Sequence, residues 1–260
     1  MKRTIACLVV LGLLATSPAL AADATTATYT LDKEVEQLLT SMSKFVGAQP
    51  HLQFDVLDSI DQIDEDGVRV QLSHLRKVQL TRPDKFASTV KGDRAERRSV
   101  FNQGRLTVLS PGENIYLQKD DLPKTVEQTL DHLAEKEGLS FPLADFLRQE
   151  IVDKSLLANI TFAEYVGESV VEPAACHHLV FQQENIDWQL WIQEGDQPVP
   201  RKLVITYRQL PGHPQFTARF NNWQFPKAIA DDVFQIEVPK TAEQVSFYSD
   251  VVKSLKEEAK

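Results

Sequence analysis

Most of the chain alternates apolar and polar residues with a period of two, the pattern of β-strands that bury one face. Between residues 52 and 117 the alternation recurs in short runs separated by turn sequences such as Asp64–Gly67. It resumes between residues 160 and 223, where Trp188 and Leu190 fall on one side of a strand. Because consecutive strands joined by short turns pair antiparallel, we expect an antiparallel sheet of about eleven strands.

Two stretches follow the helical period instead. Apolar residues from Val35 onward recur every three or four positions, which predicts a helix over about 32–46 that ends at Gly47. Residues 123–158 lie between the two blocks of strands and carry a second apolar stripe that begins at Val126. We therefore expect a helical insert in this region.

A sheet of about eleven strands curls, because every strand twists. The predicted fold class is α+β, mostly antiparallel β: a strongly curved open half-barrel with the helical insert covering its concave face. A short edge element is predicted at Asp231–Val238, and a charged terminal helix at Phe247–Lys260. No shift in composition divides residues 22–260, so we expect a single domain.

The first residues indicate export. An apolar run from Thr4 to Leu14 follows two basic residues, and Ala19–Ala21 supplies the small-x-small pattern of a cleavage site. The run is about half of the roughly 20 residues that a membrane span requires. Residues 1–21 are therefore predicted to form a secretory signal peptide that is cleaved near Ala21.

Charge and cysteine content narrow the function. The formal net charge of −9 argues against nucleic acid as a partner, since phosphates demand clustered Lys and Arg. Cys7 lies in the predicted signal peptide, so the mature chain keeps only Cys176 and no internal disulfide is expected. We interpret Cys176 as a small buried apolar residue, and a nucleophile is the alternative.

The sequence offers no catalytic or metal-binding motif. His177 and His178 are adjacent on a predicted strand, so their side chains point to opposite faces and no metal site is expected. Asp61–Gly67 resembles the start of a calcium loop, but Leu72 occupies the position of its final glutamate, which favours a solvated hairpin tip. Because no nucleophile, base and orienting group can be named together, we expect neither an enzyme nor a cofactor.

A basic stretch interrupts the acidic chain at Lys91, Arg94, Arg97 and Arg98. One interpretation is a solvated edge strand whose charges prevent pairing with another sheet. The alternative is a contact for an anionic headgroup or an acidic protein partner, made by Arg94, Arg97 and Arg98.

Several segments resemble the periplasmic lipoprotein-carrier superfamily, the LolA/LolB/RseB-like proteins. Leu80–Phe86 is similar to the Arg-Pro-x-x-Phe turn of that superfamily, Asn102–Thr107 to its Asp/Asn-Gly-Lys turn, and Val233–Pro239 to its closing Phe-x-Phe-x-x-Pro. The segment from Leu190 to Trp223 resembles, more narrowly, a family of predicted periplasmic proteins of unknown function within this group. The resemblance implies a periplasmic half-barrel over residues 22–260, and in the superfamily's carriers acyl chains occupy the cavity.

The predicted cavity has an apolar wall on the sheet and an apolar lid on the insert. The wall residues are Phe54, Trp188, Leu190, Leu203, Ile205, Phe216 and Phe220, and the lid residues are Val126, Leu130, Leu133, Leu143, Phe146 and Leu147. One interpretation is that the lid residues complete the core. The other is that they form a movable lid over a bound ligand, because ligand pockets are mostly apolar.

We therefore predict a non-enzymatic carrier that binds a hydrophobic or lipid-like ligand, or a lipidated protein. The alternative is an RseB-like interaction module that docks on a membrane-signalling or envelope protein through the Arg94–Arg98 strand or the terminal helix. Both hypotheses imply a lipid, acyl-chain or protein partner and are compatible with transient membrane contact, and neither involves nucleic acid.

Overall fold

The structure describes most of the chain that follows the predicted signal peptide. The computed structural model covers residues 30–93, 95–137, 143–150, 157 and 159–246. The signal peptide predicted at 1–21 and the terminal helix predicted at Phe247–Lys260 lie outside the described residues.

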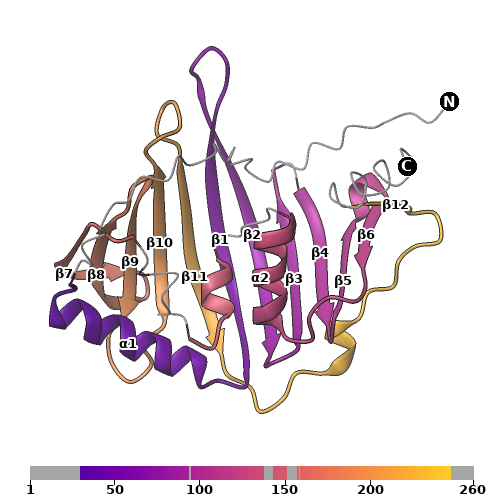
Figure 1. The fold of residues 1–260 in the computed structure, drawn as a ribbon, viewed down its shortest axis with the longest axis horizontal. Helices are drawn as coiled ribbons and strands as arrows, with labels where there is room; N and C mark the ends of the chain where they lie inside the picture. The colour runs from indigo at the N-terminus through magenta and orange to yellow at the C-terminus, as the bar shows by residue number, and fades with distance from the viewer. Residues whose placement is uncertain (1–29, 94, 138–142, 151–156, 158, 247–260) are drawn as a thin grey trace.

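Twelve strands form one sheet in the order β12-β6-β5-β4-β3-β2-β1-β11-β10-β9-β8-β7 (Figure 1). The first block of strands comprises β1 (His51–Ile63), β2 (Arg69–Thr81), β3 (Lys85–Gly92), β4 (Ala95–Asn102), β5 (Arg105–Ser110) and β6 (Ile115–Lys119). The second block comprises β7 (Phe162–Val171), β8 (Ala174–Gln182), β9 (Ile186–Gln193), β10 (Pro200–Tyr207) and β11 (Gln215–Gln224), and β12 (Glu243–Val245) follows. Neighbouring strands pair antiparallel, except that β12 pairs parallel with β6.

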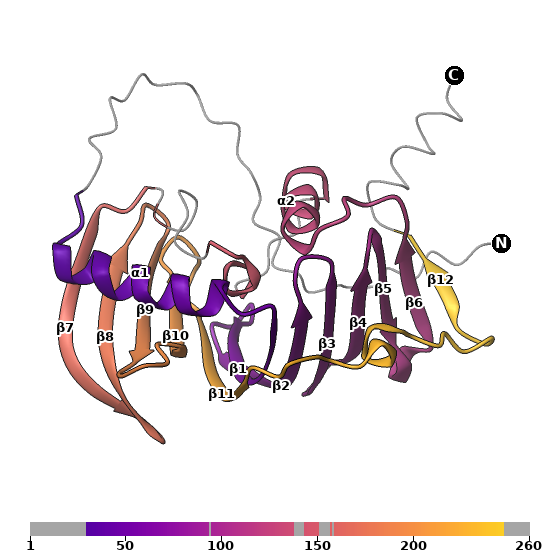
Figure 2. The ribbon, with the colours of Figure 1, turned by 90° about the horizontal axis from the view of Figure 1, so that it is seen from below.

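The sheet bends into an open trough, as Figure 2 shows. Its two ends, β7 and β12, do not pair with each other. This confirms the predicted fold class, a mostly antiparallel and strongly curved open sheet. The strand count exceeds the predicted one because the short strand Glu243–Val245 joins the far edge.

Helix α1 (Lys33–Gly47) lies in the trough over the half formed by β7 to β11 (Figure 2). The residues it turns toward the sheet, Val35, Leu39, Met42 and Val46, are fully buried. The helix ends at Gly47, where a Cβ atom would lie 1.9 Å from the carbonyl oxygen of Gln149, so only glycine allows this close approach. The helix was predicted, but the sequence did not indicate that it covers one end of β7 to β11 on the concave face.

The helical insert covers the other part of the trough. It contains α2 (Val126–Glu137), which lies on the same side of the sheet as α1, and the short helix η2 (Ala144–Leu147) between them (Figures 1 and 2). Phe146 of η2 packs edge-on against Phe220 of β11 at 5.1 Å between ring centroids. The insert and α1 therefore share the covering role that the sequence assigned to the insert alone.

The prediction of an edge element at Asp231–Val238 is wrong. This segment contains the short helix η3 (Asp231–Phe234) and crosses the convex face, where Phe234 packs against Ala87 and Val100. The Arg98 guanidinium donates a hydrogen bond to the Gln235 carbonyl at 2.9 Å and holds the segment to β4. The alternation that suggested a strand instead reflects one large side chain that is buried under a loop.

Truncation of this anchor tests how firmly the crossing segment is held. Phe234→Ala should lower the free energy of unfolding by about 3 kcal/mol, because it leaves a cavity between the segment and the sheet. Glu237→Ala, at an exposed position of the same segment, should change it by less than about 0.5 kcal/mol. Urea unfolding followed by tryptophan fluorescence measures both, and equal values for the two variants would contradict the anchoring role.

Candidate functional site

The concave face is most strongly apolar on one half of the sheet. Along β9, β10 and β11 the side chains that face the trough are almost all apolar and belong to one core cluster, which also contains the buried face of α1. Cross-strand pairs such as Leu190 with Leu203 and Ile205 with Phe216 form its rows. This wall is the candidate surface for a hydrophobic ligand.

Part of the apolar wall is filled by the protein itself. Phe54 stacks on Trp223 with ring centroids 4.2 Å apart, and Phe220 lies between Phe54 and Phe146. Together with α1, these rings occupy the end of the trough from which β1 starts. Phe146 packs in this aromatic core, and whether the insert moves as a lid over a ligand stays a prediction.

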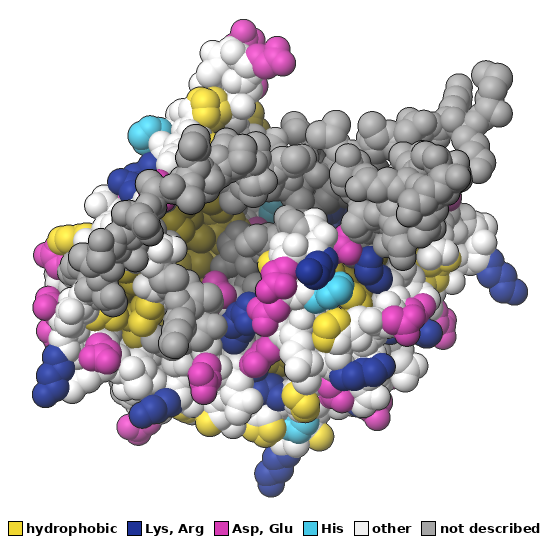
Figure 3. Space-filling model, viewed as in Figure 1, with side chains coloured by type: hydrophobic (Ala, Val, Ile, Leu, Met, Phe, Trp, Pro, Cys, Tyr) yellow, Lys and Arg dark blue, Asp and Glu magenta, His cyan; other side chains and the backbone are white. Residues whose placement is uncertain are grey.

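The other end of the wall remains a hollow. Figure 3 shows hydrophobic side chains gathered in a recess on the concave side, over the region of β9 to β11. Ile60, Ile186, Ile205 and Tyr207 pack against the core yet stay half-buried. Burial raises the pKa of the Tyr207 phenol, so this side chain stays neutral at any physiological pH. These four residues line the open part of the wall.

The structure brings the predicted wall and lid residues together with one exception. Phe54, Trp188, Leu190, Leu203, Phe216, Phe220, Val126, Phe146 and Leu147 are buried in the main core cluster, and Ile205, Leu130 and Leu143 pack against it partly exposed. Leu133 is buried but lies outside that cluster. Contact of any of these residues with a ligand stays a prediction.

Sequence analysis missed a buried carboxylate in the middle of the concave face. Asp58 occupies a position of β1 at which Leu52, Phe54 and Val56 set an apolar pattern, and it is 1 % exposed. Arg76 of β2 donates hydrogen bonds to it through Nε and Nη2, and Nδ1 of His74 lies 3.0 Å from its Oδ2 atom. A single acid in an otherwise apolar alternation was the available signal.

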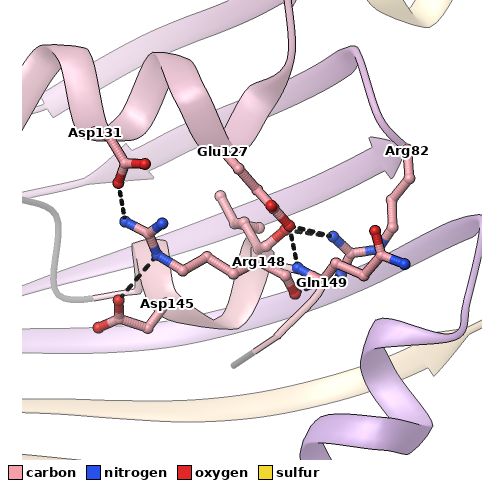
Figure 4. A network of polar contacts seen from close by, with 7 residues as sticks. Arg82, Glu127, Asp131, Asp145, Arg148 and Gln149 are labelled. Atoms are coloured by element: carbon pink, nitrogen blue, oxygen red, sulfur yellow. Dashed lines mark hydrogen bonds and ion pairs between the residues drawn. The ribbon is translucent and has the colours of Figure 1, made fainter. Parts of the chain in front are cut away.

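A polar clasp fixes the insert to the β2–β3 turn (Figure 4). Arg82 donates to the carbonyl oxygens of Leu147 at 2.7 Å and Arg148 at 2.9 Å, and its guanidinium lies 3.8 Å from the Glu127 carboxylate. Burial lowers the pKa of Arg82 and the Glu127 charge opposes that shift. Glu127 also accepts a hydrogen bond from the Gln149 amide, so one turn of the sheet holds both ends of the insert's described part.

A second ion-pair group continues the clasp. The Arg148 guanidinium lies 2.7 Å from Asp131 of α2 and 3.4 Å from Asp145 of η2. Figure 4 shows Arg148 between the two carboxylates. The insert is therefore held at this end by charged hydrogen bonds, whereas α1 is held by apolar packing.

The adjacent histidines lie on opposite faces, as predicted. His178 stacks on Trp191 with ring centroids 4.0 Å apart, and burial lowers the pKa of His178. His177 faces the other way, with its Nδ1 atom 3.1 Å from the Tyr165 hydroxyl. Both are half-buried. Over the described part of the chain, no three His, Cys, Asp or Glu side chains gather in a metal-binding arrangement.

The basic stretch does not form one surface. β4 lies between β3 and β5, so the interpretation as an edge strand is wrong. Arg98 points to the convex face, where it binds the η3 segment, and Arg97 points into the trough opposite Val90. Arg94 lies outside the described residues. A partner contact made by Arg94, Arg97 and Arg98 stays a prediction, and Arg97 and Arg98 do not share a face.

The chain is similar to a family of known proteins over most of its length. Residues 35–248 match the family described as "Predicted periplasmic protein (DUF2092)". Among proteins with curated descriptions none matches the sequence. None of the described helices is both long and apolar enough to cross a membrane.

Solved structures of similar shape have low sequence identity. An uncharacterized conserved protein from Thermus thermophilus is 11 % identical, with 82 % of this chain and 99 % of that chain covered and a TM-score of 0.49. LprF from Mycobacterium bovis is 12 % identical, with coverage of 81 % and 98 % and a TM-score of 0.47. A LolA superfamily protein from Nitrosomonas europaea is 8 % identical, with coverage of 77 % and 97 % and a TM-score of 0.36.

Removal of the clasp tests how the insert is held. Arg82→Met should speed amide hydrogen exchange at Phe146 and Arg148 about tenfold, since hydrogen bonds from a charged donor contribute about 1.5–3 kcal/mol. Exchange at Leu190, in the middle of the sheet, should stay unchanged. Protection of the η2 amides that survives the substitution would show that apolar packing alone holds the insert.

The buried thiol offers a test of the convex side of the sheet. Cys176 is 0 % exposed, and burial raises the pKa of its thiol, so both access and thiolate formation are suppressed. Iodoacetamide at pH 8 should label the protein in concentrated urea and leave the folded protein unlabelled. Rapid labelling of the folded protein, followed by mass spectrometry, would instead support the reactive-cysteine alternative.

Proposed function

We propose that this chain, which belongs to the DUF2092 family of predicted periplasmic proteins, is a non-enzymatic binding protein for a hydrophobic or lipid-like ligand, free or attached to a protein. The family is described as periplasmic, and the signal peptide predicted at residues 1–21 is consistent with this location. The ligand would lie against the apolar wall of the trough.

The half-buried apolar side chains in the hollow carry this proposal. Ile60, Ile186, Ile205 and Tyr207 lie beside a fully packed core and still keep exposed surface. A sheet that served only as a scaffold would bury such residues under a helix, as α1 does at the other end of the same strands. Apolar surface left open in a concavity is typical of a ligand site.

The energy of burial is sufficient for carriage. An acyl chain that removes about 200 Å² of apolar surface from water gains about 5 kcal/mol at roughly 25 cal/mol per Å². Part of this gain offsets the translational and conformational entropy that the ligand loses on binding. The complex is therefore reversible. A carrier needs such moderate affinity, because it must also release its ligand.

The polar groups of the trough support binding rather than catalysis. Asp58, His74 and Arg76 contact one another, so the carboxylate is held by a cation. A catalytic arrangement would place a nucleophile beside a base that is free to take its proton. The only cysteine in the described part of the chain, Cys176, lies on the convex side of the sheet, next to Trp191 and Val204.

Two adjacent residues of β10 give a matched test. Ile205 faces the hollow, whereas its neighbour Thr206 faces the convex side, where it accepts a hydrogen bond from Gln215. Ile205→Glu should abolish lipid binding, because it places a charge on the apolar wall, and Thr206→Glu should leave binding unchanged.

The measurement is native mass spectrometry of detergent-free protein after incubation with bacterial membrane lipids. Circular dichroism confirms that both variants fold. The proposal predicts adducts with lipid masses on the wild type and on Thr206→Glu only. Wild-type protein that stays free of adducts, or equal adducts on all three proteins, would contradict a site in the hollow.

A further inference from the structure

A polar area of the trough begins directly beside the apolar wall. The ends of β3, β4 and β5 that carry Phe86, Phe101 and Leu106 contribute to the main core. Toward the other ends of these strands the side chains that face the trough include Ser88, Val90, Arg97, Ser99 and Ser110. The trough-facing positions of β9 to β11 carry Trp, Leu, Ile and Phe. The concave face is therefore amphiphilic: it is apolar along β9 to β11 and carries polar residues toward one end of β3, β4 and β5.

Two arginines dominate this polar area. Arg76 of β2 lies opposite Val90 of β3, and Val90 lies opposite Arg97 of β4. Neighbouring strands are about 4.8 Å apart, so the two arginine backbones are roughly 10 Å apart and both side chains face the same concavity. Two arginine side chains at this separation can both reach one headgroup that lies over Val90, the residue between them.

Arg97 differs from Arg76 in its charge partners within the described residues. Arg76 is ion-paired with Asp58, whereas Arg97 is half-buried and has no hydrogen-bond or ion-pair partner among the described residues. No acidic side chain faces the trough from the described parts of β3, β4 or β5. Three of the four acidic residues of α2 pair with other residues: Glu127 with Arg82, Asp131 with Arg148 and Glu137 with Lys119. The fourth, Glu135, is exposed.

An unpaired guanidinium inside a concavity favours an anion. Partial burial raises the strength of a charge-assisted hydrogen bond above its value at the surface, and arginine binds carboxylate and phosphate oxygens in a bidentate geometry. In a chain with a formal net charge of −9, a site of this kind has to be local, because the overall field repels anions.

We propose that the hollow selects acyl ligands with an anionic headgroup, which Arg97 binds together with Arg76 while the chain lies on the apolar wall. This inference rests on the function proposed above and names the class of ligand. From β2 to Trp188 on β9 the path crosses four strand spacings, roughly 19 Å at about 4.8 Å each, the length scale of one long acyl chain.

The test compares two probes with the same chain, myristate and 1-monomyristoylglycerol, by isothermal titration calorimetry below the concentrations at which they self-associate. The wild type should bind myristate about tenfold more tightly than the neutral glyceride. Arg97→Gln should lower the affinity for myristate about tenfold and leave that for the glyceride unchanged.

Arg219→Gln is the matched control. Arg219 is exposed on the convex face of β11 opposite Leu57, so its substitution removes the same charge without touching the hollow. It should leave both affinities as they are. An equal loss of myristate binding in both variants would mean that the effect comes from net charge and would overturn the inference.

The remaining outcomes separate the inference from the proposed function. Equal affinity of the wild type for both probes would overturn the headgroup selection and leave the apolar site intact. A loss of affinity for both probes in Arg97→Gln would show that Arg97 maintains the fold and would also overturn it. If neither probe binds the wild type, the proposed function fails, and the headgroup inference fails with it.

Discussion

The pairing of β1 with β11 holds the two halves of the molecule together. β1 comes from the first block of strands and β11 from the second, and their register places Val56 opposite Phe220. Without this ladder, β1–β6 and β7–β11 would be two separate antiparallel meanders, each with an exposed edge and an uncovered apolar face. Closing so long a stretch of chain costs entropy, which the long paired strands and the core beneath them offset.

Charged side chains enter the concave face next to the paired strands β1 and β11. On the β11 side of β1 the concave residues are apolar, whereas β2 places His74 and Arg76 among its apolar concave residues, next to Asp58 of β1. A buried ion pair is seldom more stabilising than apolar residues of the same size, because desolvation of both charges opposes their attraction. In the binding mode proposed above, the pair would position the Arg76 guanidinium toward the headgroup of the ligand.

Local patterns were sufficient to predict the strands and the first helix. The period-two runs predicted all eleven strands from His51 to Gln224, and Asp64–Gly67 forms the predicted turn, with the Asp64 carboxylate accepting hydrogen bonds from two backbone amides. The positions of elements on the sheet were not predicted where they depend on contacts between residues far apart in the sequence. Nothing near α1 indicates that it covers β7–β11, and one large side chain, Phe234, made a crossing loop resemble an edge strand. The candidate site shows the same division: its apolar members were predicted, while Asp58, His74 and Arg76 become a group only through strand register.

Helix α1 and the helical insert are attached to the sheet by different interactions, and this difference bears on ligand binding. α1 buries four apolar side chains completely, so its removal would expose all four, and the wall beneath them, to water. The insert is held at the β2–β3 turn by hydrogen bonds of Arg82 to backbone carbonyls, which depend on direction and yield locally without disturbing the sheet. The insert adds apolar packing to these hydrogen bonds, because Val126, Phe146 and Leu147 are buried in the main core. In the binding mode proposed above, the apolar wall would set the affinity, while the charged groups of β2 and β4 would set the choice of ligand.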